Sequence, residues 1–98
     1  MKYYFFTIHK TAKRASVSDQ FALETLHKHT AYFKQLGATG NCIMAGPFAD
    51  QNTALGGGCY VFEAESEVEA KKLADADPLV VEGLYDYKVY EWMKVVPD

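Results

Sequence analysis

The sequence predicts an α+β domain with the ferredoxin-like βαββαβ arrangement, in which two helices lie on one face of a four-stranded antiparallel sheet. Two observations favour this fold. Segments with strand and helix patterns follow one another in the order strand, helix, strand, strand, helix, strand. The chain has 98 residues, of which 49% are hydrophobic, and this length leaves room for one core. A single domain over residues 1–98 is therefore expected.

The first strand is expected at residues 2–9, which are rich in aromatic and β-branched side chains. Apolar residues fall on both of its faces: Tyr3 and Phe5 on one, and Tyr4, Phe6 and Ile8 on the other. A strand with one solvated face would alternate apolar and polar residues instead. Because two helices cover only one face of the sheet, we expect a second copy of the chain on the other face, giving a homodimer.

A polar connection over residues 10–17 leads to the first helix, for which Ser18 or Ser16 is the candidate N-cap. The helix is expected over residues 18–36. Its apolar face is indicated by side chains that recur at intervals of three and four: Ala22, Leu26, His29, Phe33 and Leu36. Gly37 is expected to end the helix as a left-handed cap.

Two further strands are expected at residues 41–48 and 59–64, with a loop over residues 49–58 between them. The loop ends in three glycines, Gly56 to Gly58, which precede a strand and not a helix. They lack the Lys-Ser/Thr that follows in a phosphate-binding loop. We interpret them as a flexible hairpin element that could let a ligand approach the backbone.

The second helix begins at Ser66, which forms an S-x-x-E capping box with Glu69. Asp77-Pro78 ends it, because proline disfavours helical geometry in the residue before it. Residues 79–83 are expected to add a short helical turn, and residues 84–93 form the last strand.

A histidine and an aspartate interrupt the apolar faces of the two predicted helices. His29 lies on the apolar face of the first helix, and Asp77 follows Leu73 and Ala74 at helical spacing in the second. The two helices lie side by side in this fold, so the imidazole and the carboxylate can meet above the sheet. A carboxylate fixes the tautomer of the imidazole and stabilises its charged form, which suits a general base. A buried pair with only a structural role is the alternative, and the sequence leaves it open.

The other histidines are weaker candidates. His27 and His29 have the spacing of a His-x-His metal pair, but on a helix they point about 200° apart and cannot share an ion. No metal is therefore expected. His9 ends the first strand, where it either lines the mouth of a pocket or lies on the surface.

The composition limits the binding partners and the cell compartment that we expect for this protein. The formal net charge is -3 and no basic patch is present, so no nucleic-acid partner is expected. The apolar runs are too short to span a bilayer, and no cleavage site follows the N-terminal aromatic run. Cys42 and Cys59 form no CxxC motif and are interpreted as reduced thiols. A cytoplasmic protein without a membrane partner is the expectation.

Taken in order, several short motifs resemble those of the YCII-related family. They are His29 with Phe33 and Leu36, Ala45-Gly46-Pro47-Phe48, the glycines before Cys59, and Ala74-Asp75-Ala76-Asp77-Pro78 followed by Gly83. The resemblance runs from Tyr3 to about Lys94. It implies a dimeric α/β barrel similar to muconolactone isomerase, with an active site formed by His29 and Asp77. The chain departs from the family at Leu26, where relatives often carry an arginine, so the substrate is expected to be less acidic or held differently.

One characterised type in this family is a dehydrochlorinase that acts on a chlorinated hydroxyhydroquinone without a metal or redox cofactor. The sequence and the resemblance together predict a cofactor-independent lyase or isomerase that acts on a hydroxylated ring compound, chlorinated or not, or on a lactone. His29 would be the general base and Asp77 its orienting partner. The expected substrate-binding residues are Tyr4, Phe6, His9, Tyr32, Gly46 and Pro47. The alternative function is a non-catalytic dimeric module that binds a small ligand or a partner enzyme.

Overall fold

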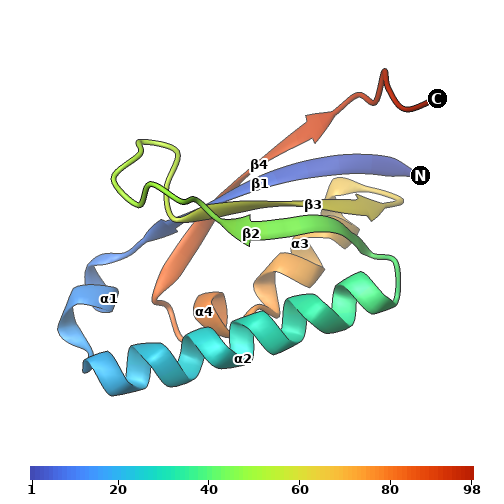
Figure 1. Cartoon of the computed structure of the whole chain (residues 1–98). Helices are drawn as coiled ribbons and strands as arrows, with labels where there is room; N and C mark the ends of the chain where they lie inside the picture. The colour runs from blue at the N-terminus through green and yellow to red at the C-terminus, as the bar shows by residue number, and fades with distance from the viewer.

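The structure is a computed structural model that describes residues 1–98, and it contains one four-stranded sheet (Figure 1). The strands are β1 (Lys2–Lys10), β2 (Cys42–Pro47), β3 (Gly58–Ala64) and β4 (Tyr85–Trp92). They are arranged in the order β2-β3-β1-β4, and every pairing is antiparallel. This topology, with helices between the strands, confirms the predicted ferredoxin-like α+β fold.

The helices α2 (Asp19–Ala38) and α3 (Glu67–Asp75) lie on one face of the sheet, together with the short α4 (Pro78–Val81) (Figure 1). Ser18 and Ser66 cap the two longer helices, because their side chains accept hydrogen bonds from the backbone of Phe21 at 3.1 Å and of Glu69 at 3.2 Å. None of the helices combines the length and the apolar character needed to cross a lipid bilayer.

Two details of the first helical region differ from the prediction. The connection predicted over residues 10–17 contains a short helix, α1 (Ala12–Ser16). Gly37 does not end the first helix, which continues to Ala38, and the left-handed residue is Gly40, with φ of +87°. Thr39 is still in the right-handed helical region, so the chain reverses only at Gly40, one residue beyond the last helical turn.

The second helical region is divided near Asp77-Pro78, as predicted, and the short helix that follows covers Pro78–Val81 instead of residues 79–83. α3 ends at Asp75, and Asp77 is the N-cap of α4 instead of a residue of the longer helix. Its side chain accepts a hydrogen bond from the backbone N–H of Leu79 at 3.0 Å. Pro78 occupies the first turn of α4, where its missing N–H has no cost. Asp77 is nonetheless turned inward, as expected, and is completely buried.

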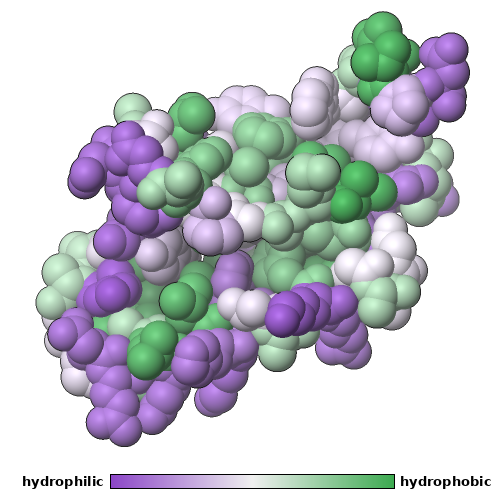
Figure 2. All heavy atoms as spheres, viewed as in Figure 1, coloured by the Kyte–Doolittle hydropathy of each residue, from purple (hydrophilic) through white to green (hydrophobic).

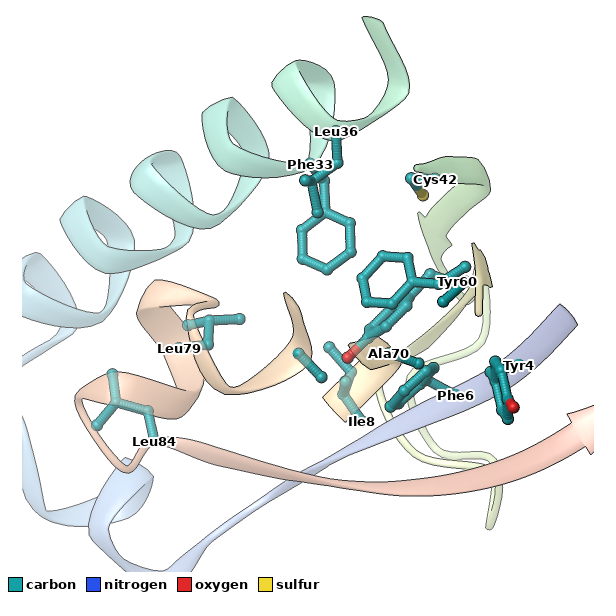
Figure 3. Close-up of a cluster of buried hydrophobic side chains, with 13 residues drawn as sticks. Tyr4, Phe6, Ile8, Phe33, Leu36, Cys42, Tyr60, Ala70, Leu79 and Leu84 are labelled. Atoms are coloured by element: carbon teal, nitrogen blue, oxygen red, sulfur yellow. The ribbon is translucent and has the colours of Figure 1, made fainter. Parts of the chain in front are cut away.

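The core lies between the sheet and the helices and is mainly aromatic near its centre (Figure 3). Tyr60 of β3 stacks on Phe6 of β1, with ring centroids 4.8 Å apart, and also meets Phe33 of α2 at 4.6 Å. Alternation along the strands sends Phe6 and Tyr60 to the same side of the sheet. These rings form the layer on which the candidate site rests.

No helix of the chain covers the opposite face of the sheet (Figure 1). Phe5 and Trp92 form an edge-to-face ring pair on this face, with centroids 5.6 Å apart. Tyr90, paired with Phe5 across the strands, is 54% exposed, and Trp92 is 56% exposed. The apolar face that led to the homodimer prediction is therefore present, and the homodimer itself stays a prediction.

Candidate active site

A cavity of about 570 Å³ opens between α2 and the sheet edge formed by β2 and β3. Its helix side is lined by Leu26, His29, Thr30, Phe33, Lys34 and Gly37. Residues 42–47 and 57–60 line the sheet side. Figure 2 shows this side of the molecule, where apolar residues gather between α2 and β2 and hydrophilic residues follow the outer side of α2. The volume falls in the range of sites for small molecules.

His29 lines this cavity and contacts Asp77, which is completely buried. Nδ1 of His29 lies 2.8 Å from Oδ1 of Asp77, although the two residues are 48 positions apart in the sequence. The side chain of His29 is 17% exposed and that of Asp77 is 0% exposed. The structure thus brings together the two residues that the sequence singled out, one from α2 and one from the start of α4.

The geometry of the pair indicates which imidazole nitrogen carries the hydrogen. An ionised carboxylate only accepts hydrogen bonds, so Nδ1 of His29 carries a hydrogen and donates it to Asp77. In the neutral ring, Nε2 then has the lone pair and can accept a proton from a bound molecule. Oδ1 of Asp77 accepts a second hydrogen bond from the N–H of Leu79, which holds the carboxylate in place.

The negative charge of Asp77 acts on the phenols around it. Burial raises the pKa of Tyr60 well above its ordinary value, and the charge of Asp77 is the next largest cause. The pKa of Tyr32 is also raised, by burial first and by Asp77 second. Both hydroxyls therefore keep their hydrogens at neutral pH.

Three aromatic residues expected to form the pocket walls have other positions. Tyr4 and Phe6 are fully buried in the core, because alternation along the central strand β1 directs them under the helices. The hydroxyl of Tyr32 donates to the backbone oxygen of Leu73 at 2.7 Å and so joins α2 to α3. The aromatic residues that line the cavity are instead Phe33, Tyr60 and Tyr85.

The remaining predicted binding residues separate into two groups. Gly46 and Pro47 line the cavity, as expected of residues that border a ligand. His9 does not, since it lies on the opposite side of β1 from Ile8 and its Nε2 is 2.8 Å from Oγ1 of Thr7. Contact between Gly46 or Pro47 and a substrate stays a prediction.

The sequence reasoning misplaced Leu26 and did not identify several lining residues, Lys34 and Tyr60 among them. Leu26 was assigned to the buried stripe but is 44% exposed at the cavity, and Thr25, 3% exposed, takes the buried position. Lys34 lies two helical turns after Leu26 and also lines the cavity, so a second row along the same helix could have revealed it. Tyr60 had no signal beyond strand alternation, which does not tell a core residue from a pocket residue.

The described residues show no group of three or more His, Cys, Asp or Glu side chains arranged to hold a metal ion. His27 is exposed on α2, two residues before His29.

Comparisons with known proteins concern the family and the fold of the chain. The profile of the YCII-related domain matches residues 1–93. "Uncharacterized protein YjpA" of Bacillus subtilis (strain 168) is 36% identical over 75 residues, which are 76% of this chain and 84% of that protein.

Among solved structures, the chain is similar to 5-chloro-2-hydroxyhydroquinone dehydrochlorinase (TftG) from Burkholderia phenoliruptrix AC1100, in complex with 2,5-dihydroxybenzoquinone. The TM-score is 0.66 and the sequence identity 23%, with 95% of this chain and 94% of that chain covered. At this identity the likeness concerns the fold.

Proposed function

This chain belongs to the YCII-related family, and on that premise we propose that it is a small enzyme whose His29–Asp77 pair transfers protons. The proposed reaction is of the lyase or isomerase type, on a hydroxylated ring compound held in the cavity beside α2. The observation that carries the proposal is the 2.8 Å contact between His29 and Asp77 at the wall of that cavity. The similar fold of a dehydrochlorinase makes loss of chloride from a chlorinated hydroxyhydroquinone the reference reaction.

In this reaction, Nε2 of His29 removes a proton from a ring hydroxyl, and the O–H electron pair forms a ketone. The proton returns to the ring carbon that bears chlorine. Removal of a second hydroxyl proton then expels chloride with the C–Cl electron pair. The net change is loss of one proton and one chloride ion, so no oxidant is required. General acid–base catalysis of this kind contributes ~10² to 10⁴-fold to the rate.

Asp77 has a supporting role in each proton transfer. Its carboxylate keeps the hydrogen on Nδ1, so that Nε2 is the basic nitrogen, and it stabilises the imidazolium that forms. Its complete burial strengthens this attraction, because little water screens the charge.

A pair sealed from ligands by side chains would favour the alternative function, a non-catalytic module. His29 keeps 17% of its side-chain surface exposed and lines the cavity, which favours the enzyme. The cavity volume of about 570 Å³ also supports a small-molecule ligand.

We expect His29→Ala and Asp77→Asn each to lower turnover by ~10-fold or more, because each removes half of the proton-transfer pair. The measurement is chloride release from 5-chloro-2-hydroxyhydroquinone, with circular dichroism as the check on folding. His27→Ala is the matched control, since His27 is exposed on the same helix. Undiminished chloride release by both His29→Ala and Asp77→Asn would rule out the pair as the catalyst, and none from the wild type would rule out this substrate.

A further inference from the structure

Two buried polar atoms of the chain have no hydrogen-bond partner in the protein: Oη of Tyr60 and Oδ2 of Asp77. Buried polar groups are nearly always paired, so each unpaired atom calls for an explanation. One of the two belongs to the candidate catalytic carboxylate. The other belongs to a residue that lines the cavity and has no part in the proton transfers described above.

Tyr60 is built into the centre of the site. Its side of β3 faces the helices, and the residue is 3% exposed. Its ring centroid lies 4.6 Å from that of Phe33, which in turn lies 4.7 Å from the ring of His29. In Figure 3, the hydroxyl of Tyr60 points toward Ala70 of α3. Asp77 lies between α3 and α4.

The hydrogen-bonding capacities of the two unpaired atoms are complementary. Oδ1 of Asp77 is already occupied by His29 and by the N–H of Leu79, so Oδ2 is the free acceptor. Burial raises the pKa of Tyr60, so its hydroxyl keeps its hydrogen and is a donor. Asp77 is also the charged group with the largest effect on that hydroxyl. A neutral donor and an anionic acceptor are therefore buried in the same region with no other protein partner.

We propose that Tyr60 is the positioning residue of the His29–Asp77 pair, and that its hydroxyl hydrogen-bonds to Oδ2 of Asp77 through one bound water. No direct hydrogen bond joins the two atoms, and a single water is the usual bridge between polar groups beyond direct reach. The water accepts from Tyr60 and donates to Asp77. This inference deepens the proposed function and rests on it, since it adds a third member to the same site.

The water-mediated hydrogen bond from Tyr60 changes how Asp77 interacts with the imidazole of His29. Hydrogen bonds at both oxygens hold the carboxylate so that Oδ1 faces Nδ1 of the imidazole. A donor at Oδ2 also spreads the negative charge and weakens the pull of Asp77 on the Nδ1 hydrogen. Loss of this donor strengthens the attraction between the carboxylate and a protonated imidazole.

Tyr60→Phe tests the proposal, because it removes the hydroxyl and keeps the ring between Phe6 and Phe33. In the free protein with ¹⁵N-labelled histidine, we expect the NMR titration midpoint of His29 to move to higher pH by about half a unit or more. The hydrogen on Nδ1 should change its chemical shift as well. Tyr87→Phe is the matched control, since the Tyr87 ring also packs on Phe6 but its hydroxyl donates to the exposed Asp75 at 2.7 Å.

An unchanged titration and an unchanged Nδ1 hydrogen signal in Tyr60→Phe would overturn the proposal. If that variant does not fold, the reciprocal test uses Asp77→Asn with ¹³Cζ-labelled tyrosine. The proposal then requires the Tyr60 signal to shift, and a signal that stays in place contradicts it. Neither measurement depends on turnover. The proposed hydrogen bond from Tyr60 to Asp77 can therefore be contradicted although chloride is released, and it can be supported although no chloride is released.

Discussion

At the scale of single residues, the informative signal in this sequence is a polar side chain at a position where the pattern predicts an apolar one. His29 and Asp77 were identifiable because each interrupts an apolar pattern, and the structure joins them at 2.8 Å. Tyr60 could not be identified in this way, because a tyrosine on the buried side of a strand is an ordinary core residue. Its unpaired hydroxyl becomes visible only once the neighbouring atoms are placed.

The buried phenols predict how stability depends on alkaline pH. Burial, followed by the hydrogen bond to Asp75, raises the pKa of Tyr87 from 10.0 to about 12, and burial raises that of Tyr60 as well. Between pH 10 and pH 12 the unfolded chain has lost these protons while the folded chain retains them. The free energy of unfolding should therefore be fully retained below pH 10 and fall as the pH rises to 12.

Urea denaturation at pH 9, 10 and 11 measures this dependence. We expect Tyr60→Phe and Tyr87→Phe each to lose less stability over this range than the wild type does. Tyr90→Phe, on the exposed sheet face, is the control. A wild-type free energy of unfolding that stays constant across these pH values would contradict the prediction.

At the scale of elements, local capping signals located helix starts better than helix ends. Ser18 and Ser66 cap α2 and α3 as predicted, because an N-cap is a contact within four residues. Gly37 was mistaken for the end of α2, since nothing local distinguishes it from Gly40. The break between α3 and α4 was predicted from Asp77-Pro78, whereas the second contact of Asp77, with His29, involves a distant element.

Gly37 and Gly56 form a matched pair for a prediction about backbone conformation. Gly37 is inside α2 and an added Cβ meets nothing within 4 Å, so Gly37→Ala should stabilise the fold by about 0.4–1 kcal/mol. Gly56 has φ of +96°, and an added Cβ would collide with the backbone oxygen of Ile8. Gly56→Ala should destabilise the fold by about 1–3 kcal/mol or more.

Thermal and urea unfolding of the two glycine variants give the required free energies. The informative outcome is a higher free energy of unfolding for Gly37→Ala and a lower one for Gly56→Ala. If both variants were destabilised equally, the placement of Gly37 within the helix would be wrong.

At the scale of the whole molecule, the order and periodicity of the segments predicted the fold, because this topology follows from short connections between adjacent elements. The cavity could not be predicted, since it depends on how far α2 stands from β2 and β3. The aromatic pattern of β1, which is apolar on both sides, did indicate that the sheet face left uncovered by the helices is apolar.

That uncovered face predicts a homodimer whose sheets pack face to face. We expect sedimentation velocity to give the mass of two chains at micromolar concentration. Replacing both Tyr90 and Trp92 with lysine should give monomers, because four buried charges would be introduced at a twofold interface. Val68→Lys is the control, since Val68 is exposed on α3. A wild-type protein that sediments as a monomer would exclude the dimer.

The position of Asp77 at the start of α4 has a consequence for redesign of this site. The same carboxylate begins a helix and receives the imidazole hydrogen, so its location is set by the main chain and not by a flexible side chain. New specificities are therefore best introduced along α2, where Leu26, Thr30 and Lys34 border the cavity without supporting that turn. Asparagine at position 77 could still begin the helix. This substitution would separate the role of the residue as the N-cap of α4 from its role as the carboxylate that receives the imidazole hydrogen.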